Sequence, residues 1–280
     1  MYQFPIGVMV DSFKTDTRTA IVKAAKLGAQ GLQMYSTTGE NSPENLNAAS
    51  RKDLLDFVKS HGLVFSAICG DLGMGFGNRE LNPSLIEKSK RIMDLAKDLE
   101  TDIVTTHIGV VPADKNHERY KIMQEACFEL ATYADSIGSH FAIETGPEPA
   151  IVLKEFLDAL GSTGVAVNLD PANLLMVTGD DPVAAVHHLK KYIVHTHAKD
   201  GIRFGENNME EIYGVVKCEK IIKNYREMPL GQGNVPFPVY LATLEEIGYR
   251  GFLTIEREVG ENPTADIQTA ANYLRSIIGH

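Results

Sequence analysis

Short apolar runs alternate with longer amphipathic stretches along the whole chain. The apolar runs are about six residues long, and their composition predicts strands. They lie at 6–10, 30–35, 63–68, 102–107, 140–144, 164–169, 192–197 and 252–256. The stretches between them carry apolar residues at helical spacing, and the first two end at Gly28 and Gly62. The pattern therefore predicts eight strand–helix units.

Eight such units predict an α/β fold, a (β/α)8 TIM barrel formed by a single domain over residues 1–280. An open doubly wound sheet is the alternative, but no GxGxxG motif follows the first strand. The glycine-rich stretch 73–78 has the wrong spacing for a dinucleotide loop and predicts a flexible loop. Two additions extend the repeat. An enlarged, partly helical loop follows the seventh strand at about 200–230, and a C-terminal helix covers about 263–279.

Composition and charge limit which classes of partner the protein can bind and which cellular compartment it can occupy. The chain has 27 Lys+Arg against 37 Asp+Glu, a net charge of −10, which disfavours a nucleic-acid partner. The three cysteines, Cys69, Cys127 and Cys218, are far apart and favour a reducing compartment. The N-terminus does not resemble a signal peptide, and no apolar run approaches the ~18 residues of a membrane span. We therefore expect a cytoplasmic protein that has no membrane partner.

Candidate chemistry gathers at the ends of four consecutive predicted strands. These strands, the fifth to the eighth, end in Glu144, Asp170, the pair His195 and His197, and Glu256. In a barrel these ends meet on the face where active sites form. Carboxylates placed directly after buried strands are unfavourable without a compensating cation. The sequence thus predicts one shared divalent metal ion. A set of oxygen ligands with one nitrogen favours Mn²⁺, and also suits Mg²⁺, Co²⁺ and Zn²⁺.

The motifs around these residues resemble those of a known superfamily. AIETGPE, VNLDPAN, HTHAKD and LGQGNVPFPVYLATLEEIGYRGFLTIERE resemble the xylose-isomerase-like sugar isomerase/epimerase superfamily, and the resemblance extends over nearly the whole chain. It implies a (β/α)8 barrel with a single divalent metal held by Glu144, Asp170, His197 and Glu256. In the ketose 3-epimerase branch the ligand is the second His of an H-x-H pair, with an Arg six residues later. Arg203 matches that Arg, which favours His197 over His195.

Two departures limit what the resemblance implies. Ala150 and Asn173 stand where the ketohexose epimerases carry a Glu and a His, although Glu148 lies near the first position. A free ketohexose substrate is therefore not implied. The barrel also resembles endonuclease IV, and His107 matches one ligand of its three-zinc site. Cys69 and Asn173 replace two other ligands there, so that set is incomplete.

We expect a metal-dependent sugar or sugar-phosphate isomerase or epimerase of carbohydrate metabolism. Such a site suits proton abstraction next to a carbonyl through a metal-bound enediolate. Of Glu144 and Glu256, one would take a proton from the substrate and the other would return one. The candidate substrate-binding residues are His107, Asn173, Lys199 and Arg203.

Three other functions remain as alternatives. One is an inosose or hydroxypyruvate-type dehydratase or isomerase that uses the same chemistry. A metal-dependent DNA phosphodiesterase and a sugar-binding barrel without activity are the others. The sequence leaves the sugar, its stereochemistry, its phosphorylation and the metal open. It also leaves open a homo-oligomer, for which residues 204–228 are a candidate contact.

Overall fold

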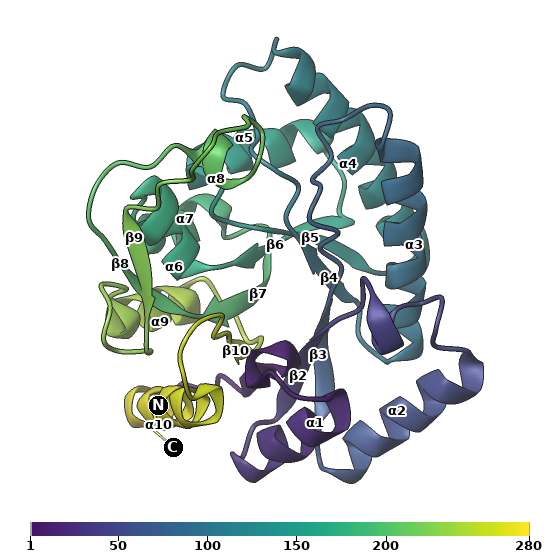
Figure 1. Ribbon diagram of the computed structural model, residues 1–280, viewed down its shortest axis with the longest axis vertical. Helices are drawn as coiled ribbons and strands as arrows, with labels where there is room; N and C mark the ends of the chain where they lie inside the picture. The colour runs from purple at the N-terminus through teal and green to yellow at the C-terminus, as the bar shows by residue number, and fades with distance from the viewer. Residues whose placement is uncertain (1, 280) are drawn as a thin grey trace.

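The computed structural model describes residues 2–279, and its main feature is a closed barrel of eight parallel strands (Figure 1). Neighbouring strands follow the order β1-β10-β7-β6-β5-β4-β3-β2. Their bounds are β1 Ile6–Met9, β2 Gly31–Tyr35, β3 Val64–Cys69, β4 Ile103–Thr106, β5 His140–Glu144, β6 Val165–Leu169, β7 Ile193–Ala198 and β10 Leu253–Ile255. All eight predicted strands and the predicted fold class are therefore confirmed.

Helices surround the barrel on the outside, as Figure 1 shows. They are α1 Thr17–Lys26, α2 Ala48–Ser60, α3 Asn82–Asp98, α4 Glu118–Ile137, α5 Ala150–Leu160, α7 Pro182–Leu189, α9 Phe237–Glu246 and α10 Pro263–Ile278. Local chemistry sets their ends. The Asp16 carboxylate caps α1 by accepting from Thr19 N at 2.9 Å, and Asn262 caps α10 in the same way. Helix α4 ends at Gly138, which adopts the left-handed conformation.

The closure of the barrel depends on a close approach at β2. Strand β1 pairs with β10 at Ile6 and Leu253, and with β2 at Gly7 and Gly31. A Cβ atom at Gly31 would lie 2.3 Å from the Phe252 ring, so only glycine lets that ring pack here. Parallel strands covered by helices are buried on both faces, which explains why they appear as nearly continuous apolar runs.

The enlarged loop and the C-terminal helix both lie where the sequence places them. The loop contains the short helix α8 Met209–Ile212, in agreement with its partly helical pattern. It also contains an antiparallel hairpin, β8 Asp200–Arg203 with β9 Tyr225–Met228, which the sequence pattern did not predict. Helix α10 confirms the C-terminal helix. Residues 73–78 form neither helix nor strand, as expected of a loop.

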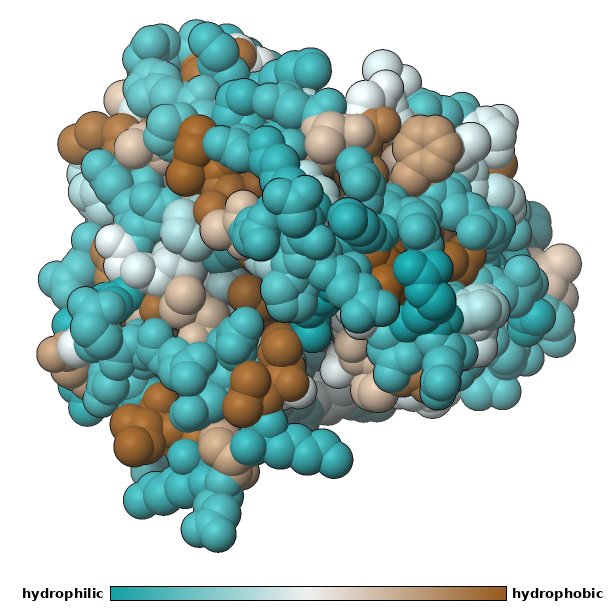
Figure 2. Space-filling model, turned by 90° about the horizontal axis from the view of Figure 1, so that it is seen from above, coloured by the Kyte–Doolittle hydropathy of each residue, from teal (hydrophilic) through white to brown (hydrophobic). Residues whose placement is uncertain are grey.

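Figure 2 shows a face that is mainly hydrophilic, with hydrophobic residues in small separate patches. Within residues 2–279, every helix is too short or too polar to cross a bilayer.

Candidate metal centre

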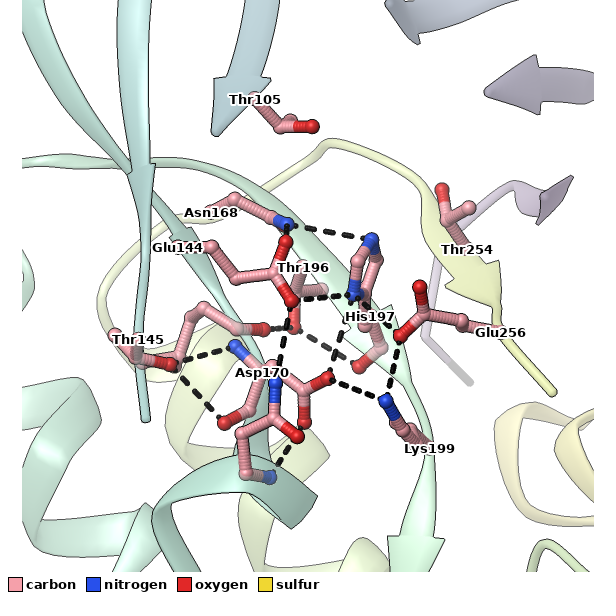
Figure 3. A network of polar contacts seen from close by, with 12 residues as sticks. Thr105, Glu144, Thr145, Asn168, Asp170, Thr196, His197, Lys199, Thr254 and Glu256 are labelled. Carbon is pink, nitrogen blue, oxygen red and sulfur yellow. Dashed lines mark hydrogen bonds and ion pairs between the residues drawn. The ribbon is translucent and has the colours of Figure 1, made fainter. Parts of the chain in front are cut away.

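Four buried side chains from four adjacent strands meet at the carboxyl end of the barrel (Figure 3). Glu144 is the last residue of β5, and His197 lies one residue before the end of β7. Asp170 follows β6 directly, and Glu256 follows β10 directly. One potential ligand atom from each of the four lies within 4.8 Å of the others. The structure thus brings together all four residues that the sequence predicted as metal ligands.

The His197 imidazole is the centre of this cluster. Its Nδ1 atom lies 3.5 Å from Glu144 Oε1, 3.4 Å from Asp170 Oδ2 and 3.3 Å from Glu256 Oε2. Figure 3 shows Glu144 and Glu256 on either side of the ring. One nitrogen and three carboxylates therefore face a common point, which is the donor set that a hard or borderline divalent cation prefers.

Buried polar residues behind the cluster hold His197 in one orientation. Its Nε2 lies 2.9 Å from Gln33 Oε1, which can only accept a hydrogen bond. The ring hydrogen therefore belongs on Nε2, and the Nδ1 lone pair is free for a metal ion. Asn168 Nδ2 donates to Glu144 Oε2 at 3.1 Å, and Asn168 Oδ1 lies 2.8 Å from His195 Nδ1. His195 thus belongs to the layer behind the cluster.

The charges of the cluster also fit a cation. Burial raises the pKa of Glu144, but His107 and His197 lower it by more, so the net shift is downward. Burial likewise raises the pKa of Glu256, but Lys199 and His197 hold it well below its ordinary value. Burial lowers the pKa of His197, but Glu256 and Glu144 raise it well above its ordinary value. The carboxylates are anionic and draw positive charge into the site. A divalent ion would supply that charge in place of the His197 proton.

Lys199, predicted as a substrate-binding residue, lies beside the cluster and contacts two of its carboxylates. Its side chain is 2% exposed, and its Nζ lies 2.9 Å from Glu256 Oε2 and 3.2 Å from Glu258 Oε1.

The next residue, Asp200, holds a turn in place. Its carboxylate accepts hydrogen bonds from the backbone N–H groups of Gly231, Gly233 and Val235, at 2.9 to 3.1 Å. This anchors the turn that leads into α9 to the end of β7.

A cavity of about 380 Å³ opens above the cluster. His107 and Asn173 line it, and both contact Glu144 Oε1: His107 Nε2 at 3.5 Å and Asn173 Nδ2 at 3.2 Å. Glu258, which pairs with Lys199, also lines it. The cavity thus reaches the four-residue cluster through two lining residues that contact Glu144. His107 and Asn173, both predicted as substrate-binding residues, line the cavity, and that role stays a prediction.

Arg203 is not brought to the cluster. Its guanidinium donates to Val177 O at 3.1 Å and pairs with Glu206 at 2.9 Å. Val177 belongs to a π-helical turn, Leu174–Thr178, that follows the short helix α6 Pro171–Asn173. The arginine therefore anchors β8 to this turn.

Three residues of the site escaped the sequence analysis. Gln33 and Asn168 are polar residues inside buried strands, with 0% exposure each, and that interruption of an apolar run was a usable signal. Tyr213 also lines the cavity, from the enlarged loop. Nothing in the sequence around Tyr213 indicated that its side chain reaches the barrel.

Comparison with known proteins agrees with this architecture. A family model described as "Xylose isomerase-like TIM barrel" matches residues 21–277. A solved structure of a xylose isomerase domain protein from Planctomyces limnophilus is 25% identical, with a TM-score of 0.81 over 98% of this chain and 96% of that one. A solved D-tagatose 3-epimerase-like protein is 18% identical, with a TM-score of 0.74 over 98% of both chains.

One curated relative extends over most of the chain. It is a putative L-ribulose-5-phosphate 3-epimerase from Haemophilus influenzae, 22% identical over 277 residues. The match covers 92% of this chain and 89% of the relative.

Proposed function

The chain belongs to the xylose isomerase-like TIM barrel family, and we propose that it is an isomerase or epimerase of a sugar or sugar phosphate that works with one divalent metal ion. The observation that carries this proposal is the buried cluster of Glu144, Asp170, His197 and Glu256 under an open cavity. Mn²⁺ suits the donor set best.

Two of the four proposed ligands, the carboxylates of Glu144 and Glu256, are also placed for proton transfer. The metal ion, when bound, supplies Lewis acidity that makes a C–H bond next to a carbonyl easier to deprotonate. Glu144 and Glu256 lie on either side of the His197 ring, so one can take a proton from the substrate carbon and the other can return one. Return to the opposite face of the same carbon gives epimerisation. Return to the neighbouring carbon gives isomerisation.

The two carboxylates differ in their surroundings. Glu144 is contacted by the side-chain amides of Asn168 and Asn173, whereas Glu256 is held by the Lys199 ammonium. The amides and the ammonium fix both carboxylates in place, so a substrate carbon can be presented to each without reorganisation.

A test for metal and turnover comes first. Elemental analysis of the purified protein is expected to find about one divalent ion per chain. Incubation of the protein with a panel of sugars in D₂O is expected to replace hydrogen by deuterium at one carbon of one compound. The panel contains L-ribulose 5-phosphate, L-ribulose, D-tagatose, D-psicose and an inosose. No exchange in the metal-loaded protein would contradict the proposal, and three zinc ions per chain would favour the phosphodiesterase alternative.

Substitution of Glu144 then tests its part in the reaction, with the metal content measured for each variant. Glu144→Gln is expected to reduce exchange at least 10²-fold, the typical contribution of a general acid or base. The exposed Glu246→Gln, which makes the same change outside the site on α9, is the matched control. Full exchange by Glu144→Gln would remove Glu144 from the proton-transfer pair.

A dehydratase or isomerase of the inosose or hydroxypyruvate type is the second candidate. Ala150 and Asn173, which stand where the ketohexose epimerases carry a Glu and a His, favour it over a free-ketohexose epimerase. The same proton abstraction followed by loss of a hydroxyl group gives dehydration. Product analysis distinguishes the two functions, because only dehydration releases water and forms an unsaturated or deoxy product.

A further inference from the structure

We propose that Tyr213, in the enlarged loop, is a substrate-positioning residue whose hydroxyl donates a hydrogen bond to the substrate on the Glu144 side of the cavity. This inference rests on the proposed function and adds to it a residue from outside the barrel strands. It also gives the enlarged loop a role in the reaction.

The loop holds Tyr213 in a defined place. Asn208 caps α8, its side-chain oxygen accepting from Glu210 N at 3.1 Å, and Tyr213 N donates to Met209 O at 2.9 Å at the end of that helix. Asn207 Nδ2 donates to Met176 O at 3.0 Å, which ties the start of α8 to the π-helical turn. The backbone before Tyr213 is therefore anchored to the barrel.

From there the tyrosine ring reaches over the site. Its centroid lies 5.6 Å from that of His107, whose Nε2 contacts Glu144. A Cβ atom built at Gly146 would lie 3.2 Å from the Tyr213 hydroxyl and 2.6 Å from Asn173 Cβ. The hydroxyl thus comes close to the backbone two residues beyond Glu144, a place that a side chain at position 146 would fill.

The hydroxyl is suited to donate rather than accept. Burial, with Glu144 as the next cause, raises the pKa of Tyr213 well above its ordinary value, so the group keeps its proton. The nearby loop amides have other partners: Asn207 Nδ2 donates to Met176 O at 3.0 Å, and Asn208 Nδ2 donates to Glu211 Oε1 at 3.1 Å. Tyr213 also lines the cavity, which leaves the donor facing the space that a substrate would occupy.

The position of the donor matters for the reaction. When Glu144 takes a proton from a carbon, negative charge develops on the neighbouring substrate oxygen. A fixed O–H donor on that side stabilises the charge and directs the C–H bond toward Glu144. Tyr213 keeps its own proton throughout, so the step balances with Glu144 as the only group that gains one.

The test is Tyr213→Phe, which removes only the hydroxyl, with Tyr133→Phe as the matched control. The Tyr133 hydroxyl bonds Asp94 on the outer surface, far from the cavity lining. Two readouts are measured on Mn²⁺-loaded protein: kcat and KM for exchange, and the Kd of threonohydroxamate, a chelating mimic of the deprotonated substrate. Metal content and Tm are recorded for each variant.

Tyr213→Phe is expected to lower kcat/KM by roughly tenfold to a hundredfold and to raise the Kd of threonohydroxamate by a similar factor. A hydrogen bond to a charged group contributes free energy on this scale. Metal content and Tm are expected to stay at the wild-type values, and Tyr133→Phe to leave every readout unchanged. Wild-type kinetics and affinity in Tyr213→Phe would overturn the inference. A parallel loss of metal or of Tm would also overturn it, by showing a structural role.

The design separates this inference from the proposed function. If wild-type protein exchanges none of the sugars, the function fails, and the threonohydroxamate affinities still decide whether the hydroxyl contacts a bound molecule. If wild-type protein exchanges a sugar and Tyr213→Phe does so equally well, the function stands and the inference fails.

Discussion

Two buried amides contact His197 Nε2: that of Gln33, across the barrel on β2, at 2.9 Å and that of Asn168 at 3.2 Å. Gln33 Oε1 accepts from His197 Nε2, and Gln33 Nε2 donates to Thr105 Oγ1 at 2.7 Å, so the amide is itself fixed. Partners of this kind set the tautomer and the direction of a metal-binding imidazole. A residue that touches no metal ion can in this way determine how tightly one is held.

We therefore expect Gln33→Leu to weaken Mn²⁺ binding by about 10- to 100-fold while the barrel still folds. Calorimetric titration of metal-free protein with Mn²⁺ measures the change. Gln268→Leu, on the exposed face of α10, is the control and should bind like the wild type. Wild-type affinity in Gln33→Leu would show that the hydrogen bond does not orient the ligand.

Glu148 is a second residue whose surroundings lead to a measurable effect. It is 3% exposed, its Oε2 accepts from Val111 N at 2.9 Å, and its Oε1 has no hydrogen-bond partner among residues 2–279. Burial raises its pKa from 4.5 to about 8, with the Val111 N–H opposing the rise. The group is therefore protonated in the folded protein at neutral pH and ionised in the unfolded chain.

The sign of the pH effect follows from this difference. Between pH 4.5 and about 8 the folded state holds a proton that the unfolded state has lost, so rising pH decreases the free energy of unfolding across that window. Glu148→Gln removes the titration. Its stability relative to the wild type is expected to increase from pH 5 to pH 8, by at most about 4 kcal/mol. Urea unfolding at both pH values measures the difference, and a difference independent of pH would contradict the assigned pKa.

At the scale of elements, one arginine joins the enlarged loop to the barrel. Arg257, next to Glu256, pairs with Glu227 of β9 at 2.6 Å and with Asp266 of α10 at 2.9 Å. The Arg257 and Glu227 side chains are 10% and 6% exposed. Removing one member of a buried pair leaves the other charge uncompensated, which is strongly destabilising.

Arg257→Met is accordingly expected to lower the free energy of unfolding by about 3 kcal/mol and to make residues 204–224 more sensitive to protease. Arg250→Met is the matched control, because Arg250 pairs with Glu245 on the surface and is 53% exposed. That change should stay within about 0.5 kcal/mol. Thermal unfolding and limited proteolysis of both variants measure these effects. Equal stability of the two would mean that β9 is held by other contacts.

The elements also show which parts of the structure the sequence could predict. Strand periodicity located all eight barrel strands, and the residues at the ends of β5, β6, β7 and β10 identified the four clustered side chains. The β8–β9 hairpin was not predicted because its strands, DGIR and YREM, are short and polar, and 21 residues join them in place of a short hairpin turn. Its stability comes from contacts such as Arg257 with Glu227, which are distant in sequence.

At the scale of the whole molecule, closure of the barrel creates contacts that no local pattern contains. Gln33 and His197 are 164 positions apart, and His195 Nε2 meets Thr254 Oγ1 at 2.9 Å across the β7–β10 junction. A polar residue in a buried strand indicates that some partner exists, but the strand order decides which one. The four clustered residues were predictable because the carboxyl ends of parallel barrel strands lie on one face. Their orienting partners were not, because they require the register of the closed sheet.

The distribution of charge leads to the last prediction, on the phosphorylation of the substrate. The chain carries a net charge of −10, yet its cavity is lined by Lys223 and Arg226. The two carboxylates that line the same cavity, Glu227 and Glu258, are paired with Arg257 and Lys199. An anionic group at the distal end of a sugar bound in this cavity would therefore be attracted to Lys223 and Arg226.

We expect the phosphorylated form of the exchanged sugar to have a higher kcat/KM than its free form, and this preference to decrease at high salt, since exposed charges are screened. Lys223→Gln/Arg226→Gln should reduce the preference by about tenfold, because each exposed ion pair contributes at most ~1 kcal/mol. Lys217→Gln/Lys220→Gln removes the same charge from the same loop outside the cavity lining. An equal effect of both double variants would assign the preference to the general field of the loop. The absence of any preference in the wild type would mean that the distal group of the substrate is uncharged.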